Sequence, residues 1–205
     1  MDLIQILGLA FGSAWTAGIN LYATVAVLGL LEHYKLAHLP GSLHVLDNWY
    51  IIGVALALYV LEFFADKIPY VDTVWDAIHT FIRVPAGAVI AAAATSGINP
   101  TVQVVALLIG GGLALSTHAT KATARGAVNV SPEPVTNWIL SIVEDIIAVG
   151  AVVLAVLHPI GILVLILIFL LILAWILPKV VRRIKHMLAI VRSFFGGRPL
   201  PNSRY

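Results

Sequence analysis

The chain has 205 residues, of which 60% are hydrophobic and only 11% are charged, and its mean hydropathy is +1.00. This composition leaves too little polar surface to cover a water-soluble globule, so it excludes that class and indicates a protein embedded in a lipid bilayer. The absence of cysteine excludes disulfides, thiolate metal ligands and thiol nucleophiles.

Long apolar segments predict the fold class. A helix that crosses the bilayer needs about 20 mostly apolar residues. Segments of this kind, bounded by Pro, Gly and charged residues, lie at residues 3–31, 49–65, 71–94, 102–128, 135–157 and 159–177. They predict an all-α fold, a polytopic transmembrane helix bundle of about six spans within residues 1–178. The third segment carries several ionisable residues together with Pro85 and Gly87, so we expect it to be kinked, short or re-entrant.

The two halves of the bundle share features that suggest an internal repeat. Aligning Thr16 with Thr117 also aligns Asn20 with Lys121, and small residues interrupt both segments, around Gly12 to Gly18 and at Gly110 to Gly112. This pattern predicts two inverted three-helix repeats, residues 1–96 and 101–178, with Gly-interrupted first helices, as in many secondary transporters. The alternative is that the small residues only allow close helix packing, within the chain or in a homodimer.

Basic residues gather after the last apolar segment. Seven of the 12 Lys and Arg residues lie there: Lys179, Arg182, Arg183, Lys185, Arg192, Arg198 and Arg204. Residues 179–205 are predicted to form a basic amphipathic tail that contacts anionic lipids, or else a simple stop-transfer flank. The positive-inside rule places this tail in the cytoplasm, and an even number of spans returns the N-terminus there, which predicts a multi-pass protein of the cell (inner) membrane.

Ionisable residues recur on single helix faces inside the predicted spans. Spacings of three or four residues place Glu62 and Asp66 on one face, and Asp76, His79 and Arg83 on another. The candidate substrate or ion-binding residues are Thr16, Asn20, Glu62, Asp66, Asp76, His79, Arg83, His118, Lys121, Arg125, Glu144 and Asp145.

Charges at membrane depth cost about 3 kcal/mol each, so they are expected to pair or to line a polar cavity. The buried or half-buried set has near-balanced charge: the acids Glu62, Asp66, Asp72, Asp76, Glu144 and Asp145, and the bases Lys67, Arg83, Lys121 and Arg125. One interpretation is structural, with ion pairs that fix the register of the bundle. The other is a polar pathway in which the acids bind a cation or relay protons, and Thr16 and Asn20 lend neutral ligands.

Other chemistry has less support in the sequence. No catalytic residue is identified, because no nucleophile-elbow motif such as G-x-S-x-G is present. No cofactor is identified beyond a bound cation or lipid, and a metal, if bound, would take its ligands from Glu62, Asp66, Glu144 and Asp145. Nucleic-acid binding has no footprint beyond the basic tail.

Three strings of the chain resemble a bacterial membrane-protein family catalogued as domain of unknown function 4126. They are GINLYATVAVLGLL from Gly18, EFFADKIPYVDTVWDAIHTFIRVPAGA from Glu62, and THATKATARGAVNVSPEPVTNWILSIVED from Thr117. The resemblance covers residues 18–159 and implies an integral membrane protein, without an activity. A shorter string, EFFADKI, is similar to the E-x-G-D-K-T signature of a cation/proton exchanger family, but has one extra residue and lacks its Gly and Thr.

The sequence thus favours a non-enzymatic membrane transporter or exchanger that moves an ion or small charged solute through a site of acids and bases. A first alternative is a protein that binds or translocates lipid, in which Arg83, Lys121 and Arg125 grip a phosphate headgroup. A second alternative is a non-transporting scaffold with structural ion pairs.

Overall fold

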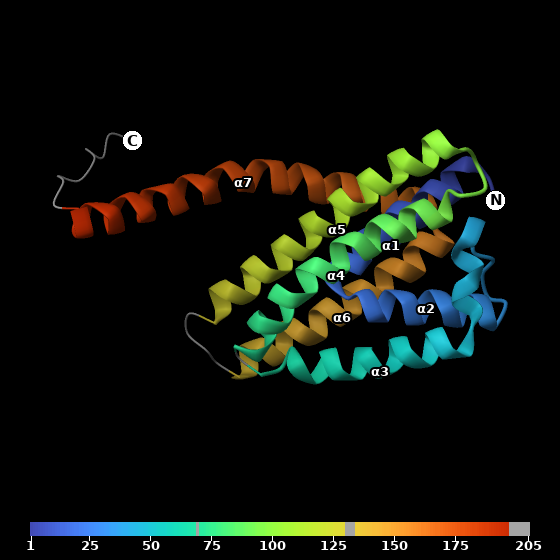
Figure 1. Ribbon diagram of the computed structural model, residues 1–205, viewed down its shortest axis with the longest axis horizontal. Coiled ribbons are helices and arrows are strands. Elements are labelled where there is room, and N and C mark those ends of the chain that lie inside the picture. Colours follow the sequence, from blue (N-terminus) through green and yellow to red (C-terminus); the bar gives the residue numbers. More distant parts are fainter. Residues whose placement is uncertain (69, 130–133, 197–205) are drawn as a thin grey trace. The chain divides into compact units, whose positions relative to one another are not determined.

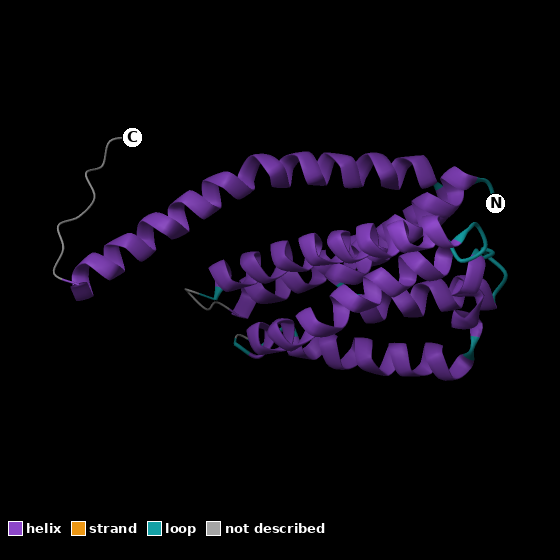
Figure 2. Cartoon of the chain, turned by 45° about the horizontal axis from the view of Figure 1, so that its top comes forward, coloured by secondary structure: helices purple, strands orange, loops and turns teal. Residues whose placement is uncertain are grey.

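The computed structural model describes residues 1–68, 70–129 and 134–196, which form helices joined by short loops (Figure 1, Figure 2). The elements are α1 (Leu3–Ile19), α2 (Leu21–His33), the 3₁₀ helix η1 (Gly41–Asp47), α3 (Trp49–Ala65), α4 (Val71–Ala94), α5 (Pro100–Val128), α6 (Pro134–Leu157) and α7 (Pro159–Gly196). The predicted all-α class is confirmed.

The number of spans is lower than the sequence predicts. Four helices of the described chain are long and apolar enough to cross a membrane, and η1 with α3, bent by 76°, makes a fifth if counted as one span. The third predicted segment is the full-length helix α4, which continues through Pro85. The difference arises at the N-terminus, where residues 3–31 form two shorter helices of 17 and 13 residues instead of one span. Several long apolar helices still indicate a multi-pass membrane protein.

Asn20 separates α1 from α2. Its extended backbone (φ −145°, ψ 101°) ends α1, while its side-chain oxygen accepts a hydrogen bond from the Ala23 N–H and so caps α2. The break therefore falls at a polar capping residue, two positions beyond Gly18, the last residue of the small-residue run of α1.

The α1–α2 pair is a helical hairpin with its tip inside the bundle. At the start of α1, a Cβ added to Gly8 would lie 2.5 Å from Pro159, and after α2 a Cβ added to Gly41 would lie 2.3 Å from the Ala93 carbonyl. The start of α7, where Pro159 lies, and the last turn of α4, where Ala93 lies, are at the same end of the bundle as the N-terminus, the right-hand end in Figure 1. The pair thus enters and returns to one end, and its arms are about 25 Å and 20 Å long.

Helix α1 lies in the core and contacts α4, α5 and α6. Its close approach depends on residues without bulky side chains: a Cβ on Gly18 would lie 1.9 Å from Thr117 Oγ1 of α5, and one on Gly12 would lie 2.6 Å from the Ala155 Cβ of α6. Helix α5 is continuous through Gly110 to Gly112, so it does not repeat the break at Asn20, and this arrangement does not show the predicted repeat.

The chain divides into two compact units, residues 1–163 and 164–205, and the boundary falls inside α7. Helix α7 continues through Pro178, and Arg182 and Arg183 are exposed. The apolar positions predicted for the amphipathic tail, among them Ile184 and Leu188, lie outside the residues whose side chains are described. The predicted orientation in the membrane stays a prediction.

Candidate functional site

Eight ionisable side chains from four helical elements meet inside the first unit. We call them the charged network: the cations Arg83, Lys121 and Arg125, and the carboxylates Glu62, Asp66, Asp72, Asp76 and Glu144. None of the eight residues is more than 8% exposed. Eight of the ten predicted acids and bases therefore meet in one buried network, whereas Lys67 and Asp145 take no part in these ion pairs.

Lys121 of α5 occupies the middle of the charged network. Its Nζ lies 2.9 Å from Asp66 Oδ2, 3.4 Å from Glu144 Oε2, 3.6 Å from Glu62 Oε1 and 3.8 Å from Asp76 Oδ1. The ammonium also donates a hydrogen bond of 3.2 Å to the Ile19 carbonyl at the end of α1. One cation thus joins α3, α4, α6 and the hairpin tip.

Two arginines flank Lys121. On the deeper side, Arg83 donates to Glu62 Oε1 at 2.5 Å and to Asp76 Oδ1 at 3.2 Å. On the other side, Arg125 donates to Glu144, to Asp66 Oδ2 at 3.1 Å and to the Asp66 carbonyl at 2.6 Å. The planar guanidinium suits such multidentate contacts better than an ammonium does.

Asp72 anchors the end of the charged network nearest the helix termini. It lies in the first turn of α4, where the helix dipole stabilises a carboxylate, and accepts hydrogen bonds from Asn129 Nδ2 at 2.8 and 3.0 Å. From Val71 at the start of α4 to Arg83 is about 18 Å, somewhat over half of a hydrocarbon core about 30 Å thick. The charged network therefore reaches from the first turn of α4 to the middle of that helix.

The hydrogen bonds of His118 fix its protonation state. Its Nδ1 lies 3.0 Å from Arg83 Nη1, and because a guanidinium only donates, this nitrogen carries no proton. Its Nε2 then donates to the Asp76 carbonyl at 3.0 Å. His118 is neutral and adds no positive charge. His79 has a pattern that suits a neutral ring too, with Nδ1 donating to the Trp75 carbonyl and Nε2 accepting from Tyr22.

The charged network is not balanced. Five carboxylates face three cations, so it carries two excess negative charges when every carboxyl is ionised. Within the described chain, the buried oxygens Glu62 Oε2, Asp66 Oδ1 and Asp76 Oδ2 have no hydrogen-bond partner. Burial of an uncompensated carboxylate costs several kcal/mol, and uptake of a proton or a cation removes that cost.

Asp66 and Lys67, which follow α3, have different neighbours: Asp66 lies beside two cations, whereas Lys67 donates to neutral oxygens. Burial alone would raise the pKa of Asp66, but the adjacent Lys121 and Arg125 outweigh it and hold that pKa below its usual range. Burial lowers the pKa of Lys67, whose Nζ donates to the Phe63 carbonyl at 3.0 Å and to Ser141 Oγ at 3.2 Å. Asp66 is therefore ionised at neutral pH.

The remaining predicted residues lie at the hairpin. Asn20 Nδ2 donates to Asp145 Oδ1 at 3.0 Å, which ties the tip to α6. The Thr16 hydroxyl instead donates to the Ser13 carbonyl of its own helix. Tyr22, which the sequence analysis did not select, contacts His79 at 3.0 Å, and only the hairpin geometry reveals it.

No group of three or more His, Asp or Glu side chains in the described ranges is arranged to hold a metal ion. Three of the predicted metal ligands, Glu62, Asp66 and Glu144, contact the cations of the charged network instead. The fourth, Asp145, is bound by Asn20.

The family model described as domain of unknown function (DUF4126) matches residues 7–179, a range that includes the hairpin and the whole charged network. No curated protein and no solved structure matches the chain.

Proposed function

Because the chain belongs to the DUF4126 family, whose description assigns no activity, we propose a function from its own residues: a small secondary transporter in which the charged network binds and releases protons. The observation that carries this proposal is the excess of two carboxylates over cations in a site shielded from water. A purely structural set of ion pairs would be expected to balance.

Glu62 and Asp76 are the proposed proton carriers. Each has one oxygen engaged by Arg83 and a second buried oxygen without a partner within the described ranges. A proton on either carboxyl brings the charged network closer to neutrality. A proton on Glu62 also weakens its ion pairs with Arg83 and Lys121, which link α3 to α4 and α5, so proton uptake there would loosen α3.

The hairpin tip supports a transport role. Lys121 contacts the carbonyl end of α1, and Asp145 contacts Asn20 at the amino end of α2. Both charges match the helix-end dipoles they face. Interrupted helices whose ends meet charges near mid-membrane are a recurrent feature of substrate and ion sites in secondary transporters.

The phosphate-headgroup alternative has weaker support. Arg83, Lys121 and Arg125 are each at most 5% exposed and already engage carboxylates. A phosphate would add negative charge to a network that already has an excess. The scaffold alternative would require the charged network to contain neither extra protons nor a cation.

The proposal can be tested without knowing the substrate. Infrared difference spectroscopy of the protein in proteoliposomes at neutral pH should show the carbonyl stretch of a buried protonated carboxylic acid. Glu62→Gln and Asp76→Asn should each reduce that band, whereas Asp47→Asn, at an exposed carboxyl, should leave it unchanged.

Transport is then measured as acidification of a dye trapped in the same vesicles, with a potassium diffusion potential as driving force. Candidate ions and small charged solutes are added one at a time. A missing protonated band together with wild-type flux in both network variants would remove the acids from the mechanism and favour the scaffold alternative.

A further inference from the structure

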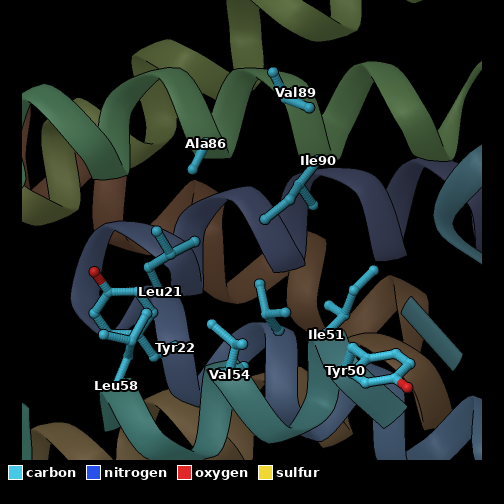
Figure 3. A pocket seen from close by; sticks show the side chains of 11 residues that line it. Leu21, Tyr22, Tyr50, Ile51, Val54, Leu58, Ala86, Val89 and Ile90 are labelled. Atoms are coloured by element: carbon cyan, nitrogen blue, oxygen red, sulfur yellow. The ribbon is translucent and has the colours of Figure 1, made fainter. Parts of the chain in front are cut away.

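An apolar groove runs along α3 in the first unit, separate from the charged network. Its volume is ≈ 500 Å³, and three helices line it: α2 with Leu21, Tyr22 and Val25, α3 with Tyr50, Ile51, Val54, Ala55 and Leu58, and α4 with Ala86, Val89 and Ile90 (Figure 3). The α3 residues recur at helical spacing, so they form one continuous face.

The walls of the groove offer almost nothing to a polar ligand. Its only side-chain polar atoms are the hydroxyls of Tyr22 and Tyr50, and the Tyr22 hydroxyl is already bonded to His79 at 3.0 Å. The small side chains of Ala55 and Ala86 create the hollow where larger ones would fill it. Apolar hollows of this kind do not hold water, because water finds no hydrogen-bond partners there.

The groove has the position and length of a lipid chain in one leaflet. From Tyr50 to Leu58 it follows α3 for about 12 Å, which approaches half of a hydrocarbon core about 30 Å thick. Val54 and Val89 on its walls are 60% and 61% exposed, so it opens sideways where the surrounding medium is hydrocarbon. Trp49 and Tyr50 mark its end near the start of α3, as aromatic residues do at membrane interfaces.

We propose that this groove binds one acyl chain of a membrane phospholipid, with the headgroup near Trp49 and Tyr50 and the chain end against Leu21 and Tyr22. An unfilled hollow would forfeit the dispersion contacts of its walls, and the bilayer supplies an apolar occupant at that depth. Three helices surround the chain, so it is held more firmly than lipid on the convex faces of the bundle. The proposal does not depend on proton transport.

Photo-crosslinking tests the proposal with a defined probe. The full-length protein is reconstituted in phosphatidylethanolamine and phosphatidylglycerol vesicles that contain a trace of phosphatidylcholine with a diazirine near the end of one chain. Labelled peptides are then mapped by mass spectrometry. We expect label to concentrate on peptides around Leu21, Tyr22 and Leu58, where the proposed chain end lies.

Two filling variants and one matched control make the test sharp. Ala86→Phe and Val54→Phe, on different walls, should each lower groove labelling on the order of tenfold. Val104→Phe, at an apolar α5 position that is 58% exposed and outside the groove, should not. Label spread over all apolar faces in proportion to exposure, or crosslinks from the groove to a second copy of the chain, would overturn the proposal.

Discussion

Replacing Lys121 with methionine removes one of three cations from a site that already holds five carboxylates, so the excess negative charge rises from two to three. The Lys121 ammonium lies within 4 Å of four carboxylates, and its loss removes the positive charge that offsets their mutual repulsion. Removal of one partner from a buried ion pair costs about 3–5 kcal/mol. For a chain of this size, that loss lowers Tm by roughly 6–20 °C.

Removing an acid should have a much smaller effect. Glu62→Gln lowers the excess charge from two to one and keeps the shape of the side chain, so we expect a loss of about 1 kcal/mol or less. The double variant Lys121→Met with Glu62→Gln restores the excess to two and should be more stable than Lys121→Met alone. Lys35→Met, at an exposed cation outside the charged network, is the control for the loss of a lysine.

The Tm of all four variants is measured in one mild detergent, by circular dichroism or with a fluorescent dye that does not react with thiols. The signs and sizes of the changes in Tm are compared among the four variants, so the comparison does not depend on the absolute stability of the protein. Equal destabilisation by Lys121→Met and Glu62→Gln would mean that acids and bases are balanced, and would refute the charge-excess argument.

The remaining predictions concern the hairpin, its packing and pH. Asn20→Ala should destabilise the protein more than Asn99→Ala, because both remove a helix N-cap worth about 1 kcal/mol but only Asn20 also bonds a buried carboxylate; thermal unfolding compares them. Gly18→Ala should abolish the tight contact of α1 with α5 and lower the yield of folded protein, whereas Gly112→Ala, with open space around it, should be neutral or stabilising by about 1 kcal/mol; size-exclusion profiles and Tm distinguish them. The pKa of Asp66 is lowered in the folded state, so its carboxylate stabilises the fold fully above the unfolded pKa of about 4. This stabilisation is lost as the pH falls through the lower pKa of the folded state. Asp66→Asn should therefore flatten the acid limb of the curve of Tm against pH.

The meeting of acids and bases could be predicted from the sequence. Spacings of three and four residues put Asp76 and Arg83, or Lys121 and Arg125, on single helix faces, and hydrocarbon leaves such faces no environment except each other. The predicted set of six acids and four bases already held an excess of two acids. The sequence could not show which of these side chains share one site, or that an Arg83 hydrogen bond keeps His118 neutral.

The break in the first predicted span was expected at glycines and occurs at Asn20. Glycine frees the backbone, but Gly12 and Gly18 serve close packing, since a Cβ on Gly18 would collide with Thr117. Asn20 ends one helix and caps the next through its own side chain, so it satisfies backbone groups that a glycine would leave open. The sequence alone is compatible with a glycine that breaks the helix and with a glycine that packs against a neighbour. The positions of the neighbouring helices show that Gly12 and Gly18 pack.

Burial of α1 has a consequence for how the protein is made. It leaves the ribosome before α4, α5 and α6, the helices against which it packs. Neither arm of its hairpin is long enough to stand alone across the bilayer, and Asn20 has no favourable place in lipid until Asp145 arrives. The hairpin can therefore complete its contacts in the bundle only after α6, the helix that carries Asp145, has been made.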